Sequence, residues 1–79
     1  MKILILSGKE VIKALQKIGY HEIRQRGSHV RLTGLNKKSI TVPDHKVIGR
    51  GLLRKILRDV EISPKEFQQL VKKREKKEN

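Results

Sequence analysis

The sequence contains no cysteine and no tryptophan, and its single tyrosine and single phenylalanine are Tyr20 and Phe67. Without cysteine the chain has no disulfide and no thiolate for catalysis or metal binding. With so few aromatic side chains it cannot provide the stacking platform on which RRM-type sheets hold bases. The apolar run in the opening "MKILILSG" is far shorter than a signal peptide or a membrane span requires. We therefore expect a cytoplasmic protein with no membrane partner.

What the sequence has in excess is positive charge, with a formal net charge of +12 over 79 residues. The excess is concentrated in residues 24–58, which hold ten basic residues and a single acidic one, Asp44. A basic segment inside the folded part of a chain is typical of a phosphate-binding surface. Two alternatives remain open, a lysine-rich surface that only keeps the protein in solution and a surface for anionic membranes. The membrane alternative is disfavoured because no helix combines a basic face with a Trp/Phe-rich one.

Three segments carry helix signals. Ser7 and Glu10 form a capping-box pattern, apolar residues follow at helical spacing, and Gly19 provides a stop, which predicts a helix over 8–18. The segment "LLRKILRDV" predicts a second amphipathic helix. In "SPKEF" the serine is Ser63, a good N-cap followed by proline, and this predicts a short third helix.

Between the first two helices the sequence predicts three strands. "YHEIRQ" (20–25) alternates poorly, whereas "HVRLT" (29–33) and "SITV" (39–42) alternate cleanly and are joined by the loop "GLNKK". Pairing residue 33 with residue 39 puts 31 opposite 41 and 29 opposite 43, with residues 44 and 45 just beyond. One face of this hairpin is then apolar, with Val30, Leu32, Ile40 and Val42, and the other polar, with His29, Arg31, Thr33, Ser39 and Thr41.

The predicted fold is α+β in the order α-β-β-β-α, with a short C-terminal helix. Each helix has one apolar stripe to bury, so the helices are expected to cover one face of a three-stranded antiparallel sheet. Residues 1–71 are expected to form a single domain and residues 72–79 a basic tail.

Histidine is the side chain best suited to proton transfer near neutral pH, and the chain has His21, His29 and His45. Their spacing does not match a zinc site, so we expect no metal and no cofactor. The phosphate-cradling loop pattern is missing, and the carboxylates are too few for paired acid–base work on a carbohydrate. Phosphodiester cleavage fits best, because RNA supplies its own 2′-hydroxyl nucleophile and needs only proton transfer and charge stabilisation. On chemistry alone, the favoured interpretation of His29 is a surface histidine without a function.

Three segments, "RQRGSHVRL", "ITVPDHK" and "GLLRKILRDVEIS", resemble the HicA family of toxins, small ribonucleases of toxin–antitoxin systems. That family has an R-Q-x-G-S-H strand end, a V-P-x-H strand end and a G-T-L-R-x-I-L helix followed by I-S. The resemblance runs from Ser7 to Phe67. Two positions depart from the pattern, since Leu52 replaces the usual threonine and Glu61 replaces a common glycine. The glycine would have provided the left-handed residue that ends the second helix.

The resemblance implies a fold like that of the double-stranded-RNA-binding domain, cleavage of mRNA with His29 as the catalytic residue, and a HicB-type antitoxin that covers the site. Gly27 and Ser28 are expected to shape the turn that exposes His29, and His45 is either a second acid–base group or a loop residue. Arg54 and Arg58 are either RNA contacts or a solvated helix face. The alternative function is a non-catalytic module that binds structured RNA. The expected phosphate-binding residues are Arg24, Arg26, Arg31, Lys37, Lys38, Lys46 and Arg50.

Overall fold

The three helices and three strands predicted from the sequence are all present in the structure, a computed structural model. It describes the backbone of residues 5–76 and the side chains of residues 5–71, so part of the apolar start and the side chains of the predicted tail lie outside the described residues. The α+β fold is confirmed. In chain order the elements are α1 (Gly8–Gln16), β1 (His21–Arg26), β2 (His29–Gly34), β3 (Lys37–Pro43), α2 (Arg50–Val60) and α3 (Pro64–Lys76).

The three strands form one antiparallel sheet in the order β1-β2-β3. The predicted register of β2 and β3 is confirmed at the end of the hairpin away from its turn, where Arg31 pairs with Thr41 and His29 pairs with Pro43. At the other end the register shifts between Leu32 and Gly34, and Gly34 pairs with Lys37. The predicted five-residue loop is therefore only a two-residue turn, in which Asn36 takes a left-handed conformation with φ 58°.

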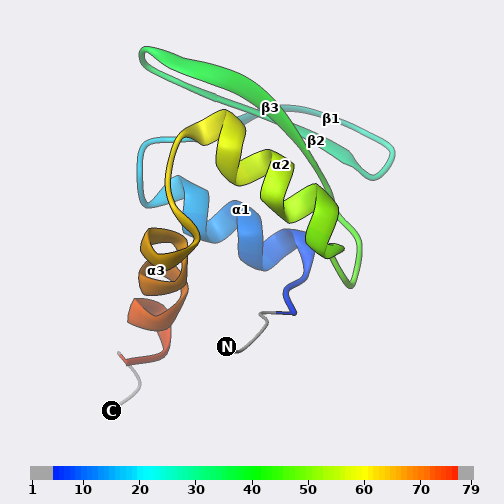
Figure 1. Cartoon of the computed structure of the whole chain (residues 1–79). Helices are drawn as coiled ribbons and strands as arrows, with labels where there is room; N and C mark the ends of the chain where they lie inside the picture. The colour runs from blue at the N-terminus through cyan, green and yellow to red at the C-terminus, as the bar shows by residue number, and fades with distance from the viewer. Residues whose placement is uncertain (1–4, 77–79) are drawn as a thin grey trace.

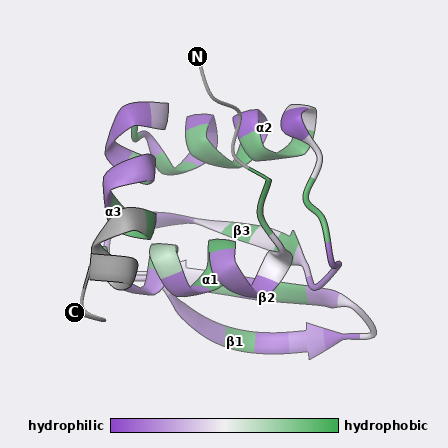
Figure 2. Ribbon diagram, turned by 90° about the horizontal axis from the view of Figure 1, so that it is seen from below, coloured by the Kyte–Doolittle hydropathy of each residue, from purple (hydrophilic) through white to green (hydrophobic). Residues whose placement is uncertain are grey.

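β1 is one of the two edge strands, and all six of its residues are exposed. Its poor alternation has a physical cause, because a strand that no helix covers has no face to bury and no need for a hydrophobic pattern. The hydropathy colouring of Figure 2 shows β1 as mostly hydrophilic. The side chains of this strand, and the backbone groups on the side away from β2, are consequently on the surface.

α1 and α2 cover one face of the sheet, as predicted, whereas α3 packs mainly against these two helices. Figure 1 shows α1 and α2 on the same side of the strands, with α3 beyond their ends. The apolar face of the hairpin packs against them and is fully buried, while the hydrophobic side of α2 faces inward (Figure 2). The buried core consists of Leu6, Val11, Ile12, Ala14, Leu15, Tyr20, Val30, Leu32, Ile40, Val42, Ile48, Ile56, Leu57 and Phe67.

α1 begins as the capping box predicts. The Glu10 backbone N–H donates to Ser7 Oγ at 3.2 Å, and the Ser7 backbone N–H donates to Glu10 Oε1 at 2.9 Å. The helix ends at Gln16 rather than at residue 18, because the next two backbone N–H groups, of Lys17 and Ile18, bond three residues back in a tightened last turn.

α2 and α3 each differ in one respect from expectation. α2 has no glycine at its C-terminal cap, but Glu61 takes the left-handed conformation (φ 56°, ψ 45°) that glycine would adopt more easily. α3 has the predicted Ser63 cap but is not short, since it runs for 13 residues to Lys76. No glycine or proline follows Pro64, and the lysines, glutamates and glutamines of this segment are good helix formers.

Candidate active site

The outer face of the sheet carries a hollow of about 200 Å³ beside the β1–β2 turn, lined by Arg24, Arg26, His29, Arg31 and Thr41. Strand pairing brings these residues together. Arg26 pairs with His29 across β1 and β2, Arg24 pairs with Arg31, and Arg31 pairs with Thr41 on β3. Because side chains alternate along a strand, burying Val30 and Leu32 forces His29 and Arg31 to the opposite, solvent-facing side.

The hollow is strongly electropositive. Within residues 5–71, no carboxylate lies within ion-pair distance of Arg24, Arg26 or Arg31. Arg31 is held in place by donating from Nη1 to Thr41 Oγ1 at 3.0 Å. Three guanidinium groups with no internal counter-charge are well suited to a phosphodiester, which they can contact with two parallel hydrogen bonds each.

The ring of His29 is exposed, and none of the described residues donates a hydrogen bond to it or accepts one from it. Its nitrogens are therefore available to a bound substrate. The three histidines do not meet, and no group of three metal-ligating side chains occurs among residues 5–71.

The turn that precedes His29 is built from Gly27 and Ser28. Gly27 has φ 59°, a left-handed conformation that most side chains disfavour. The Ser28 carbonyl accepts a hydrogen bond from the Asp44 backbone N–H at 2.6 Å, which ties the turn to the end of β3. The Gln25 side-chain amide donates to the Gly27 carbonyl at 3.0 Å. The turn is thus held from both neighbouring strands.

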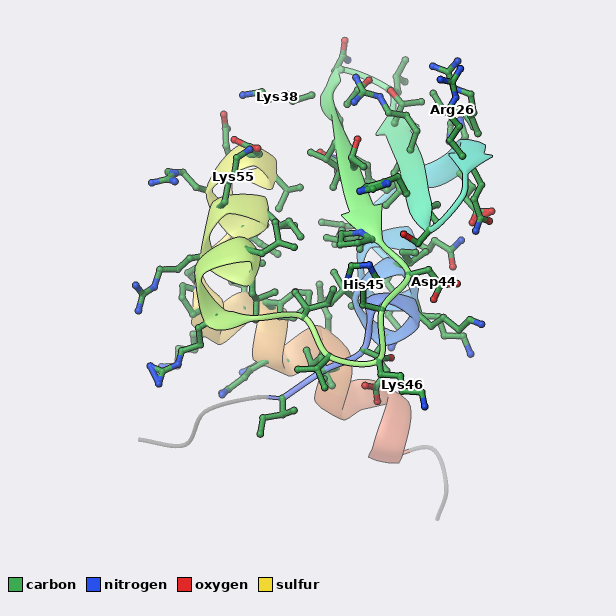
Figure 3. The ribbon with its side chains drawn as sticks, turned by 90° about the vertical axis from the view of Figure 1, so that its right-hand side faces the viewer. Arg26, Lys38, Asp44, His45, Lys46 and Lys55 are labelled. Carbon is green, nitrogen blue, oxygen red and sulfur yellow. The ribbon has the colours of Figure 1, made fainter. Side chains whose placement is uncertain are left out.

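His45 lies next to this turn, but it is not among the residues that line the hollow. Its Nε2 is 3.4 Å from Ser28 Oγ, and its carbonyl accepts from the Gly8 backbone N–H at 2.9 Å. Figure 3 shows Asp44, His45 and Lys46 along the connection that follows β3. The sequence therefore predicted correctly that residues 44 and 45 lie just beyond His29 across the hairpin.

The predicted phosphate-binding residues separate into groups. Arg24, Arg26 and Arg31 gather around His29, whereas the other four are exposed but do not line that hollow. Lys37 lies over the Tyr20 ring, 5.7 Å from its centroid, and Lys38 is 3.4 Å from Asp59. The remaining two predicted residues lie on the connection after β3 and at the start of α2, at Lys46 and Arg50.

Two contributions were not predicted from the sequence. Thr41 was placed on the polar face but not assigned to the site, although its alternation and its position opposite Arg31 were sufficient signals. The ion pair of Lys38 with Asp59 was also missed, because it joins β3 to α2 and no local pattern predicts it. The ion pair of Lys55 with Asp59 was missed although both lie on α2, and their i, i+4 spacing was a sufficient signal.

In a comparison with protein families, residues 8–62 match the family described as the HicA toxin of bacterial toxin–antitoxin systems. The chain belongs to the HicA toxin family. The matched region runs from α1 to the end of α2 and includes the hollow and the Gly27–Ser28 turn. Comparisons with curated proteins and with solved structures gave no match.

Membership of the HicA family makes this protein the toxin member of a toxin–antitoxin pair, so an antitoxin partner is implied. α3 lies beyond the matched region and extends the fold that the family shares. No described helix is both long and apolar enough to cross a membrane.

Proposed function

We propose that this HicA-family protein is an endoribonuclease that cleaves mRNA in the cytoplasm without a metal, with His29 as its catalytic acid–base residue. The observation that carries the proposal is the position of His29, which shares a solvent-facing hollow with Arg24, Arg26 and Arg31. A proton-transfer group beside unpaired guanidinium groups is what cleavage of RNA by its own 2′-hydroxyl requires.

In the proposed reaction the 2′-oxygen attacks the adjacent phosphorus, and the bond from phosphorus to the 5′-oxygen breaks. The 2′-hydroxyl loses its proton, the leaving 5′-oxygen gains one, and the products carry a 2′,3′-cyclic phosphate and a 5′-hydroxyl. His29 exchanges the proton, while the three arginines stabilise the negative charge that develops on the phosphoryl oxygens. No metal ion is needed for any of these steps.

The geometry favours a positioning role for His45 over a second acid–base role. His45 contacts Ser28 rather than the hollow, so its ring supports the turn that presents His29. If this is correct, His45→Ala lowers the cleavage rate without removing either limb of the pH–rate profile. A second acid–base group would remove one limb when it is replaced.

The test compares wild type, His29→Ala and His21→Ala on an end-labelled mRNA, with EDTA present throughout. His21 is a matched control, because it is another exposed strand histidine but lies at the far end of β1, opposite Thr33. We expect the wild type and His21→Ala to cut the RNA and His29→Ala to bind it without cutting. Ends that carry a 3′-hydroxyl, or cleavage that stops in EDTA, would contradict the mechanism.

A second candidate function is a non-catalytic RNA-binding module. One observation favours it. A general base is commonly oriented by a side chain that is hydrogen-bonded to it, and no described side chain makes such a bond to the His29 ring. Expression in growing cells separates the two functions. An active toxin arrests growth and its His29→Ala variant does not, whereas a binding module gives the same growth with both.

We propose a HicB-type antitoxin as the partner, with an acidic surface that covers the basic hollow. Residues 24–58 carry ten basic residues and one acidic residue, so an acidic partner should associate quickly and in a salt-sensitive manner. Complex formation at the same rate in low and high salt would show that charge is not the main basis of this recognition.

A further inference from the structure

A second hollow, of about 290 Å³, lies between β3 and α2. Basic and hydroxyl side chains form much of its lining, together with a single carboxylate. The residues that matter for its chemistry are Arg31, Lys38, Ser39, Thr41, Lys55 and Asp59. Figure 3 shows Lys38 extending from β3 toward the side of α2 that carries Lys55. We call this hollow the β3–α2 groove.

Asp59 holds the two lysines of the groove. Its carboxylate oxygens lie 3.4 Å from Lys38 Nζ and 3.3 Å from Lys55 Nζ. Partial burial alone would raise the pKa of Asp59, but the hydrogen bonds and charges of Lys55 and Lys38 outweigh burial and lower it. The carboxylate is therefore ionised at neutral pH, and one negative charge faces two positive ones.

The groove retains the capacity to bind an anion. The lysine side chains are 66% and 63% exposed, so their ammonium groups keep donors free for a ligand from solution. Exposed ion pairs of this kind are weak and are readily exchanged for another anion. A phosphate that displaces the carboxylate would gain both ammonium groups, with the hydroxyls of Ser39 and Thr41 in the same lining.

The groove adjoins the hollow around His29, because Arg31 and Thr41 line both. A nucleic-acid strand bound at His29 can therefore reach the groove with a neighbouring phosphate. An acidic protein segment would meet the same charges, but this shared lining favours the strand that already occupies the first hollow.

We propose that the β3–α2 groove is a second phosphate subsite for the RNA strand, and that Asp59 is an internal competitor that lowers its affinity. The proposal rests on the proposed ribonuclease function and extends it from one phosphate to two. It assigns Lys55, which no motif singled out, to RNA binding, and it assigns Asp59 the opposite effect.

Binding of a fluorescently labelled single-stranded RNA oligonucleotide tests the subsite in four proteins: wild type, Lys55→Ala, Asp59→Asn and Lys65→Ala. Lys65 is the matched control, since it is an exposed lysine on α3 outside both hollows. We expect Lys55→Ala to weaken binding several-fold and to reduce the slope of log affinity against log salt by about one, as the loss of one phosphate contact does. We expect Asp59→Asn to tighten binding several-fold and Lys65→Ala to resemble wild type.

Cleavage assays on the same proteins separate this proposal from the first one. In wild type, a longer oligonucleotide should be cut faster than a dinucleotide with one phosphate, and Lys55→Ala should reduce that ratio. If RNA is cut but Lys55→Ala and Lys65→Ala bind and cut it equally, the subsite is wrong and the ribonuclease function stands. If Lys55→Ala weakens binding but no protein cuts RNA, the catalytic proposal is wrong instead. If Lys55 and Asp59 affect only binding of the antitoxin, the groove is a protein interface and the subsite is overturned.

Discussion

The end of α2 offers a direct test of how the backbone limits stability. Glu61 has φ 56° and ψ 45°, and its neighbour Ile62 donates a backbone hydrogen bond to the Leu57 carbonyl at 3.2 Å, which closes the helix. A residue with a Cβ atom is disfavoured in this conformation by about 1–2 kcal/mol, whereas glycine is not. Glycine loses about 0.5–1 kcal/mol of this advantage through its greater freedom in the unfolded chain.

Glu61 is also a negative charge at the negative end of the helix dipole, which costs about 0.3–1 kcal/mol at an exposed position. Together these effects predict that Glu61→Gly stabilises the protein by about 1 kcal/mol. For a domain of this size that raises the melting temperature by about 4–8 °C, as circular dichroism would measure.

Glu61→Ala is the matched control, because alanine removes the charge but keeps the Cβ atom. We expect it to gain only the contribution of the charge, and therefore clearly less than the glycine variant. Equal stability of the alanine and glycine variants would refute the conformational reasoning. A glycine variant less stable than wild type would refute the whole account.

Two further predictions concern stability. Phe67 is 1% exposed and anchors α3 to the core, so Phe67→Ala should lower the free energy of unfolding by about 3–5 kcal/mol, as measured by urea titration. Leu35 is the control, because its side chain is 85% exposed, and Leu35→Ala should change the free energy of unfolding by less than about 0.5 kcal/mol. The lowered pKa of Asp59 contributes stability that is present above its ordinary value of 3.8 and is lost as pH falls through the lower folded value. Asp59→Asn should thus reduce the urea midpoint at pH 7 and have a smaller effect at pH 2, and an equal effect at both values would contradict the ion pairs.

The hairpin shows how far a simple sequence pattern can predict structure. The alternation of β2 and β3 predicted which side chains are buried, which face solvent, and that Arg31 lies opposite Thr41. This succeeds because one face must be buried, and a shift by one residue would expose the whole apolar set. The pattern failed near the turn, where Gly34 can approach the backbone of Gly19 because it has no Cβ atom, and the register shifts.

The candidate site was predictable to the extent that its residues lie on that hairpin and on the strand beside it. Arg24 and Arg26 were singled out by their nearness to His29 in the chain, and strand pairing indeed places them around it. The β3–α2 groove was not predictable, since Lys38 and Asp59 are 21 residues apart and meet only because α2 packs against β3. The length of α3 was missed for a different reason, because helix propensity shows where a helix is allowed but not where it stops.

Because side chains alternate along β2, the residues that stabilise the fold and the residues proposed for catalysis lie on opposite faces of the strand. The inward side chains of β2, Val30 and Leu32, are 2% and 0% exposed, and they carry the packing energy of the strand. The outward ones, His29 and Arg31, are exposed and contribute little to it. Replacing His29 with alanine should therefore leave the unfolding curve almost unchanged, and any loss of RNA cleavage in that variant can be assigned to lost chemistry. The same reasoning does not extend to Gly27, because a residue with a Cβ atom at φ 59° would strain the turn itself.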